Sequence, residues 1–165
     1  MVVRTVASET LQLTSHSLAD TLSIGMDLGR AALAGDFISL AGDLGAGKSR
    51  LAEGIARGLG VAESVAIPSP TFTIVNEHQA RVLLVHADFY RLSSAAELEA
   101  IGWRDYESRD PVIVVEWLSH VEDHVAPEDR LDIRIETRSE SERTITLRAF
   151  RPRGLRLLAA CRRAG

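Results

Sequence analysis

Residues 42–49 read GDLGAGKS and match the pattern G-x-x-x-x-G-K-[ST] in full. Each part of this pattern suits the binding of a phosphate chain. Glycines let consecutive backbone N–H groups curl around phosphate oxygens, and the start of the following helix adds a positive charge of about half a unit. We expect Lys48 to reach the β- and γ-phosphates and the Ser49 hydroxyl to ligate Mg²⁺. The pattern therefore predicts a site for a nucleoside triphosphate with Mg²⁺.

Composition singles out Lys48 independently of the motif. Of the 19 basic residues, 18 are arginine and Lys48 is the single lysine. A compact ammonium on a flexible stem is a different chemical object from a planar guanidinium, so position 48 requires that particular charge. The residues expected to bind the nucleotide are Gly42, Asp43, Leu44, Gly45, Ala46, Gly47, Lys48, Ser49, Arg50 and Trp117.

Two apolar, strand-like runs each end in a carboxylate. Asp88 ends VLLVHAD, and Glu116 ends VIVVE. A carboxylate at the end of a buried strand lies near the ligand edge of an α/β sheet. Either acid is a candidate to ligate Mg²⁺ or to orient an attacking water. The alternative for each is a strand-end acid in a salt bridge.

Three neighbouring side chains each have two interpretations. Thr71 lies in the loop PSPTF, where its hydroxyl either senses a γ-phosphate or bonds its own turn. Trp117 either contacts the nucleotide or packs inside the protein or against a partner. His86, on a strand, is interpreted as an interior histidine rather than a catalyst.

Length and composition restrict the class of protein. The chain has 165 residues, with 45% hydrophobic and 25% charged residues, which is typical of one globular domain. A net charge of −4 argues against a dedicated nucleic-acid binder. No stretch approaches the roughly 18 apolar residues of a membrane helix, and the first residues lack the apolar core of a signal peptide. The single cysteine, Cys161, excludes an internal disulfide. We therefore expect a soluble cytoplasmic protein without a membrane association.

The order of elements predicts an α/β domain. We expect a P-loop NTPase-like three-layer fold with a mixed, mainly parallel central sheet and antiparallel C-terminal strands. The run PVIVVEW is apolar throughout, as in a strand buried on both faces, whereas the last two strands alternate polar and apolar residues. The expected helices are 17–33, 48–59 and 93–102, and the expected strands are 37–41, 71–75, 82–88, 111–117, 131–137 and 143–150.

The C-terminal end differs in composition from the rest. We predict a single P-loop ATPase domain over residues 1–150 and an Arg-rich tail over 151–165, helical around 155–161. Residues 143–165 hold seven arginines and no acidic residue. A basic tail on an acidic body could contact RNA or an acidic partner. The alternative is a solvated end without such a role.

Five segments, taken together and in this order, resemble the TsaE family, formerly called YjeE. These are bacterial P-loop ATPases of tRNA threonylcarbamoyladenosine (t6A) synthesis, and the resemblance spans about residues 9–150. It implies a small α/β fold that binds ATP and Mg²⁺ and hydrolyses ATP. It also implies action with the TsaB–TsaD complex, which transfers the threonylcarbamoyl group to adenosine 37 of tRNA. The segments are GDLGAGKS, PSPTFTIVNEH, HADFYRL, ELEAIGWRDY and VIVVEW.

The resemblance also assigns roles by position in these motifs. It implies that Lys48, Thr71, Asp88 and Glu116 are the catalytic residues and that Trp117 lies beside the nucleotide. Ser49, Asp88 and Glu116 are the implied Mg²⁺ ligands. Ser49 replaces the threonine that is commonest in the family, which keeps the hydroxyl. Arg50 stands where a second hydroxyl residue is often found, and we expect its side chain to point away from the phosphates.

The residues alone leave the class of nucleotide chemistry open between a hydrolase and a kinase. For a small-molecule or nucleoside kinase, Arg104 and Arg109 are the lid-like candidates, although no segment is long enough for an independent lid. A third hypothesis is a nucleotide-gated binding module with little hydrolysis, in which the loop around Thr71 becomes ordered on the γ-phosphate. The tRNA pathway, with tRNA reached through the complex, comes from the resemblance alone.

Overall fold

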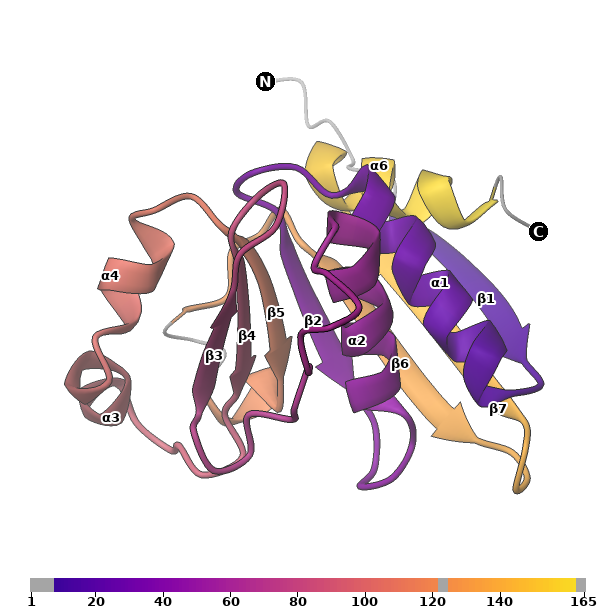
Figure 1. The fold of residues 1–165 in the computed structure, drawn as a ribbon, viewed down its shortest axis with the longest axis horizontal. Coiled ribbons are helices and arrows are strands. Elements are labelled where there is room, and N and C mark those ends of the chain that lie inside the picture. Colours follow the sequence, from indigo (N-terminus) through magenta and orange to yellow (C-terminus); the bar gives the residue numbers. More distant parts are fainter. Residues whose placement is uncertain (1–7, 122–124, 163–165) are drawn as a thin grey trace, which may run out of the picture.

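The computed structural model describes residues 8–121 and 125–162, and within them the strands form one mixed sheet (Figure 1). The strand order is β1-β7-β6-β2-β5-β4-β3. The central strands β6, β2, β5 and β4 run parallel, while β1, β7 and β3 pair antiparallel with their neighbours. This confirms the predicted fold class. The strands are β1 Glu9–Ser15, β2 Phe37–Ala41, β3 Val75–His78, β4 Leu84–Asp88, β5 Val112–Glu116, β6 Leu131–Thr137 and β7 Arg143–Ala149.

Helices cover both faces of this sheet. Helices α1, α2 and α6 share the main core with strands β2, β6 and β7, and Figure 1 shows α1 and α2 lying across the sheet side by side. Helices α3 and α4 belong to a second core cluster, around Phe89 and Trp103, at the β3 and β4 end. None of the helices in the described ranges is long and apolar enough to cross a membrane. The helices are α1 Leu18–Ala31, α2 Lys48–Leu59, α3 Ala95–Ala100, α4 Trp103–Glu107 and α6 Pro152–Arg162, with a 3₁₀ turn η1 at Leu118–His120.

Most expected elements are confirmed with shifts of a few residues at their ends. Helix α1 begins after Ser17, whose Oγ caps it by accepting a hydrogen bond from the Asp20 amide at 3.0 Å. The expected strand at 71–75 is wrong over most of its length. A turn is closed there by a 2.7 Å bond from the Ile74 amide to the Pro70 carbonyl, and the strand begins at Val75.

Two elements were missed by the sequence analysis. Strand β1 was not predicted, although ETLQLTS alternates in burial along its length. The expected helix 93–102 is α3, but α4 was not predicted; it starts directly after Gly102, which adopts a left-handed φ of 71°. A glycine supports this conformation without the strain that a Cβ would add.

The prediction of a tail is corrected for residues 152–162. They form α6, whose Leu157, Leu158 and Cys161 are buried in the main core. The apolar side chains recur at helical spacing and therefore cover the sheet beside α1. Residues 163–165 lie outside the described part of the chain.

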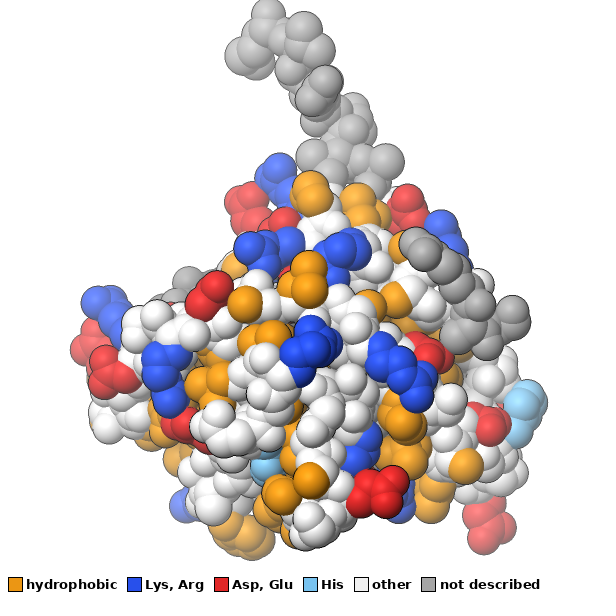
Figure 2. Space-filling model, turned by 45° about the horizontal axis from the view of Figure 1, so that its top comes forward, with side chains coloured by type: hydrophobic (Ala, Val, Ile, Leu, Met, Phe, Trp, Pro, Cys, Tyr) orange, Lys and Arg blue, Asp and Glu red, His pale blue; other side chains and the backbone are white. Residues whose placement is uncertain are grey.

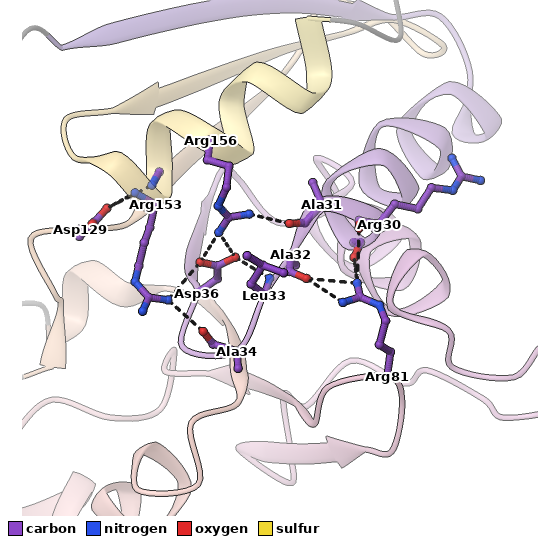
Figure 3. A network of polar contacts seen from close by, with 12 residues as sticks. Arg30, Ala31, Ala32, Leu33, Ala34, Asp36, Arg81, Asp129, Arg153 and Arg156 are labelled. Atoms are coloured by element: carbon purple, nitrogen blue, oxygen red, sulfur yellow. Dashed lines mark hydrogen bonds and ion pairs between the residues drawn. The ribbon is translucent and has the colours of Figure 1, made fainter.

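A buried carboxylate anchors α6 to the start of β2 (Figure 3). Asp36 is fully buried, and Arg156 Nη2 donates to both of its oxygens at 2.6 Å. The same guanidinium donates through Nη1 to the Ala31 carbonyl at the end of α1. Arg153 lies 3.5 Å from Asp36 and donates to the Ala34 carbonyl. A buried charge is tolerated only when it is paired in this way.

Other arginines of this end are also held by acids of the domain. Arg151 pairs with Glu128 at 2.8 Å and Arg162 with Glu9 at 3.0 Å. On the face drawn in Figure 2, basic and acidic side chains are interspersed. These pairs reduce the positive charge that α6 presents to a polyanion. Contact of the C-terminal end with RNA stays a prediction.

Glycines set the distance between α1 and α2, which run parallel. A Cβ on Gly25 would lie 2.9 Å from the Gly54 Cα, and one on Gly29 would lie 2.8 Å from the Gly58 Cα. Both distances are inside van der Waals contact, and the atoms that would have to move are backbone atoms. Glycine inside a helix normally weakens it. The structure shows that Gly25 and Gly29 allow the two backbones to touch.

We expect Gly29→Ala to lower the free energy of unfolding by about 1–3 kcal/mol, the usual cost of overpacking a core. Alanine normally favours a helix over glycine, so the loss reports the contact with α2. Urea titration of the variant against the original chain measures it. Ser23→Ala, at an exposed position of the same helix, is the matched control and should change stability by about 0.5 kcal/mol or less. Equal stability of Gly29→Ala and the original chain would contradict the close approach.

Candidate nucleotide-binding site

The motif loop joins β2 to α2 as the sequence predicts. Strand β2 ends at Ala41, and α2 begins at Lys48 directly after Gly47, which has a φ of 116°. A residue with a Cβ is strained at that angle, which explains the glycine before the lysine. The first turn of α2 therefore opens onto the loop, where its free N–H groups and positive dipole end favour an anion.

Lys48 is buried at the centre of this loop. Its side chain is 5% exposed, and Nζ donates to the carbonyls of Gly42 at 2.7 Å and Asp43 at 3.0 Å. Burial lowers the pKa of Lys48, while the carboxylates of Glu116 and Asp88 act in the opposite direction. These two acids thus lie close enough to influence the ammonium charge. Both loop carbonyls are ligands that phosphate oxygens can replace.

Asp88 and Glu116 meet at the same edge of the sheet. They are opposite each other in the parallel ladder of β4 and β5, and Glu116 is also opposite Leu40 of β2. The two acids are 4% and 3% exposed. Neither is in an ion pair with a lysine or arginine among the described residues, which argues against a strand-end salt bridge. The structure thus brings the two predicted acids together beside the loop.

Thr71 is joined to Asp88 across a long stretch of sequence. Thr71 Oγ1 donates to Asp88 Oδ2 at 3.1 Å, and the Tyr90 amide donates to Oδ1 at 2.9 Å. Ser69 Oγ lies 2.9 Å from Thr71 Oγ1. The Asp88 carboxylate is therefore held on both oxygens, and one of its holders is the loop that the sequence predicted to respond to a phosphate.

His86 contributes to the site in a way that the sequence analysis missed. It is 2% exposed, and its Nε2 lies 3.0 Å from Glu116 Oε1. An ionised carboxylate only accepts, so Nε2 donates and holds the Glu116 side chain in place. Burial lowers the pKa of the nearby His78, and His86 acts in the same direction. The interpretation of His86 as interior is correct, but the structure adds its bond to a predicted catalytic acid. The alternation of VLLVHAD, which places His86 two residues before Asp88, was the available signal.

An aromatic group closes the side of the loop nearest β5. The Lys48 ammonium lies 4.8 Å from the centre of the Trp117 ring, within the range of a cation–π contact. Tyr90 packs edge-on against Trp117 with 5.1 Å between ring centres, and His120 lies near both rings. Trp117 has a left-handed φ of 59°. Backbone strain of this kind is typical of functional sites.

Two further predicted residues, Ser49 and Arg50, lie at the start of α2. Ser49 is exposed in the first turn of α2, whereas Arg50 donates to Glu53 at 2.7 Å and is directed along the helix. The two arginines considered as a kinase lid are engaged by other acids. Arg109 forms a bidentate ion pair with Glu77, with hydrogen bonds of 2.7 and 2.9 Å, and Arg104 lies 3.8 Å from Glu99. The structure does not bring either arginine to the loop.

The oxygen atoms of the site fit Mg²⁺. Two carboxylates and the Ser49 hydroxyl are hard donors, and Mg²⁺ in nucleotide sites takes one or two protein oxygens together with substrate phosphates. Within the described ranges, no group of three or more His, Cys, Asp or Glu side chains could hold a metal by itself. The arrangement therefore suits a metal that arrives with a phosphate chain.

Parallel central strands, a glycine loop that leads into a helix, and two buried acids at the ends of neighbouring strands together define a P-loop α/β protein. The comparisons narrow this class. A family model described as threonylcarbamoyl adenosine biosynthesis protein TsaE matches residues 15–145. The chain belongs to the TsaE family, whose members take part in the biosynthesis of t6A in tRNA.

Relatives in several bacteria support the assignment. The TsaE protein of Bacillus subtilis is 42% identical over 116 residues, which is 70% of this chain and 70% of the relative. The TsaE protein of Treponema pallidum is 34% identical over 137 residues, which is 83% of this chain and 99% of the relative. The crystal structure of Bacillus subtilis YdiB matches with a TM-score of 0.81 and 30% identity, covering 96% of this chain and 97% of that one.

Proposed function

We propose that this protein binds ATP with Mg²⁺ and hydrolyses it to support t6A formation at adenosine 37 of tRNA. It acts with the TsaB–TsaD complex and does not transfer the threonylcarbamoyl group itself. One observation carries the enzymatic part: the buried Lys48 and the paired acids Asp88 and Glu116 lie at one edge of the sheet. The pathway is supported by membership of the TsaE family.

The geometry suggests a division of roles among these side chains. Lys48 exchanges the carbonyls of Gly42 and Asp43 for oxygens of the β- and γ-phosphates. The Ser49 hydroxyl and the Asp88 carboxylate would hold Mg²⁺. When bound, Mg²⁺ neutralises charge that develops on the phosphate oxygens during cleavage.

Glu116 orients the attacking water. Its Oε1 is engaged by His86, and this bond does not involve Oε2. A carboxylate fixed through one oxygen presents the other in a defined direction, which is what positioning a water requires. Thr71 connects this region to the loop at 69–74 through its bond to Asp88. A change in phosphate occupancy at Asp88 is thereby transmitted to that loop.

Exposed apolar side chains around the site support dependence on protein partners. Leu44 on the phosphate loop is 93% exposed, and Phe72 beside Thr71 is 86% exposed. Tyr90, which follows Asp88 and Phe89, is 57% exposed. Exposed apolar side chains next to a functional site are candidates for protein contacts. We propose that TsaB–TsaD contacts these side chains in the cytoplasm, and that tRNA is reached through the complex.

The test is the rate of ATP hydrolysis by the purified protein, alone and with TsaB–TsaD and tRNA. We expect a low rate alone and a clear rise with the complex, because the exposed loops around Thr71 and Leu44 gain a partner. A rate that does not respond to the complex would contradict the partner-coupled part of the proposal. No hydrolysis under either condition would contradict the enzymatic part.

Assays on the same purified protein distinguish the proposed ATPase from a kinase and from a nucleotide-gated binding module. Transfer of phosphate from ATP to a nucleoside or metabolite would indicate a kinase, although Arg109 is engaged by Glu77 rather than placed as a lid. A binding module that hardly hydrolyses would bind TsaB–TsaD with different affinity in ATP and in ADP. The bond between Thr71 and Asp88 favours some response of this kind, and it is compatible with hydrolysis.

A further inference from the structure

Arg143 lies at the edge of the sheet where the phosphate loop lies. It is the first residue of β7 and is opposite Thr137 of β6 and Ser15 of β1. Both β1 and β6 are antiparallel to β7, and β6 is parallel to β2, so these strands end at the edge that carries the loop. Arg143 shares a face of β7 with Ile145 and Leu147, which are fully buried in the core beneath the helices.

The guanidinium of Arg143 extends to the start of α2. Its Nε lies 3.8 Å from the position that a Cβ on Gly47 would occupy, and Thr21 of α1 borders the same position at 4.0 Å. Gly47 directly precedes the buried Lys48. Arg143 is therefore a second cation beside the phosphate loop, contributed by a segment far away in the sequence.

One donor of Arg143 has no partner in the part of the chain that the structure describes. Nη1 donates to the Glu140 carbonyl at 3.1 Å, but Nε is buried and has no hydrogen-bond partner among the described residues. Native proteins pair nearly all buried polar atoms, so an unpaired one requires an explanation, and a bound ligand is one that fits its place beside the phosphate loop. No carboxylate of the described chain is in an ion pair with Arg143.

Arg138 of the same hairpin shows the contrast. Its Nε donates to Thr144 Oγ1 at 2.8 Å, and its Nη2 lies 3.4 Å from Glu136. The hairpin between β6 and β7 thus satisfies Arg138 with its own side chains. It leaves the corresponding donor of Arg143 facing the start of α2.

The two flanks of the phosphate loop therefore differ in charge. Strand β2 lies between β5 and β6, so Glu116 and Asp88 border the loop on one side and Arg143 on the other. A guanidinium is weakly hydrated and presents several donors in a fixed plane, which suits phosphate oxygens. Acids on one flank suit the metal, and a cation on the other suits the phosphate chain itself.

We infer that Arg143 is a nucleotide ligand supplied by the β6–β7 hairpin, donating through its guanidinium to the phosphate chain on the flank opposite Asp88 and Glu116. This rests on the proposed binding of ATP. The sequence analysis counted Arg143 only as part of the basic C-terminal end, because nothing in its local pattern marks it. Its register opposite Ser15 and Thr137 brings it to the site.

The test compares Arg143→Gln with Arg138→Gln as matched control, since both remove one charge from the same hairpin. Calorimetric titration measures the affinity of each for ATP and for ADP with Mg²⁺. We expect Arg143→Gln to weaken the binding of both nucleotides by about tenfold or more, the effect of losing one charge-assisted hydrogen bond. Arg143→Lys should retain part of the affinity, and Arg138→Gln should bind within about twofold of the original chain.

A measurement on the unaltered protein guards against a folding defect in the variants. The ¹⁵N-bound Hε signal of Arg143, assigned by its loss in Arg143→Lys, should shift when ADP is added. Three results would each overturn the inference. These are an unchanged nucleotide affinity in Arg143→Gln, an equal loss of affinity in Arg138→Gln, and an Hε signal that does not shift on addition of ADP. Failure of the original chain to bind either nucleotide would instead overturn the proposed function.

Discussion

Glu116→Gln should lower the rate of ATP hydrolysis by about 10²–10⁴-fold, the range expected when a group that handles the proton of the attacking water is removed. Glutamine has nearly the same shape, and its carbonyl oxygen can still accept the bond from His86 Nε2. The phosphate loop and Lys48 are unchanged, so we expect ATP affinity to stay within about threefold of the original. Single-turnover hydrolysis and equilibrium titration separate the two quantities.

The control for this variant is Glu99→Gln, which removes an exposed carboxylate from α3, away from the phosphate loop. It should leave both hydrolysis and affinity unchanged. If Glu116→Gln hydrolyses ATP at the original rate, Glu116 does not act on the water. A parallel loss of affinity and rate would place Glu116 in binding rather than in the chemical step.

Lys48→Ala should abolish measurable ATP turnover and weaken the binding of ATP by about two orders of magnitude. A buried ammonium that faces phosphate oxygens contributes one of the strongest classes of hydrogen bond, and the chain has no other lysine to replace it. Its removal also frees the carbonyls of Gly42 and Asp43 that Nζ now holds. The measurement is ATP titration, together with t6A formation in a reaction reconstituted with TsaB–TsaD.

Lys48→Met is the companion variant, because it keeps the length of the side chain and its packing beside Trp117 but removes the charge. We expect it to bind ATP as poorly as Lys48→Ala while unfolding at a temperature no lower than the original. Should either variant still support t6A formation at the original rate, the proposed role of ATP in the pathway would be wrong. Recovery of ATP binding in Lys48→Met alone would mean that packing, not charge, is what position 48 provides.

His86 connects these predictions to the core of the protein. Its ring is buried, and among the described residues its side-chain hydrogen bond is to Glu116. Two bonds hold Asp88 in a similar way, one from Thr71 and one from the Tyr90 amide. The carboxylates of the site are therefore fixed before any substrate binds. Groups that are already oriented lose little freedom on reaching the transition state, which is one source of catalytic rate.

The sequence by itself determined the parts of the site that are contiguous in the chain. The phosphate loop occupies eight consecutive residues, and its glycines, Lys48 and Ser49 have roles that depend on local backbone geometry. Asp88 and Glu116 follow apolar runs, and the carboxyl ends of parallel strands meet at one edge whatever the rest of the fold. The class of protein and the meeting of two of its acids were therefore predictable, while ATP and Mg²⁺ stay predictions.

Only the tertiary structure decided which distant residues touch. The bonds of Thr71 to Asp88 and of His86 to Glu116 depend on the register of β4 against β5 and on the turn before β3. The same is true of α6, which the composition predicted as a tail and which Asp36 anchors. Arg143 reaches Gly47 because β7 lies two strands away from β2. The physical reason is common to all: periodicity shows which face of an element is apolar, while strand order and register decide what that face meets.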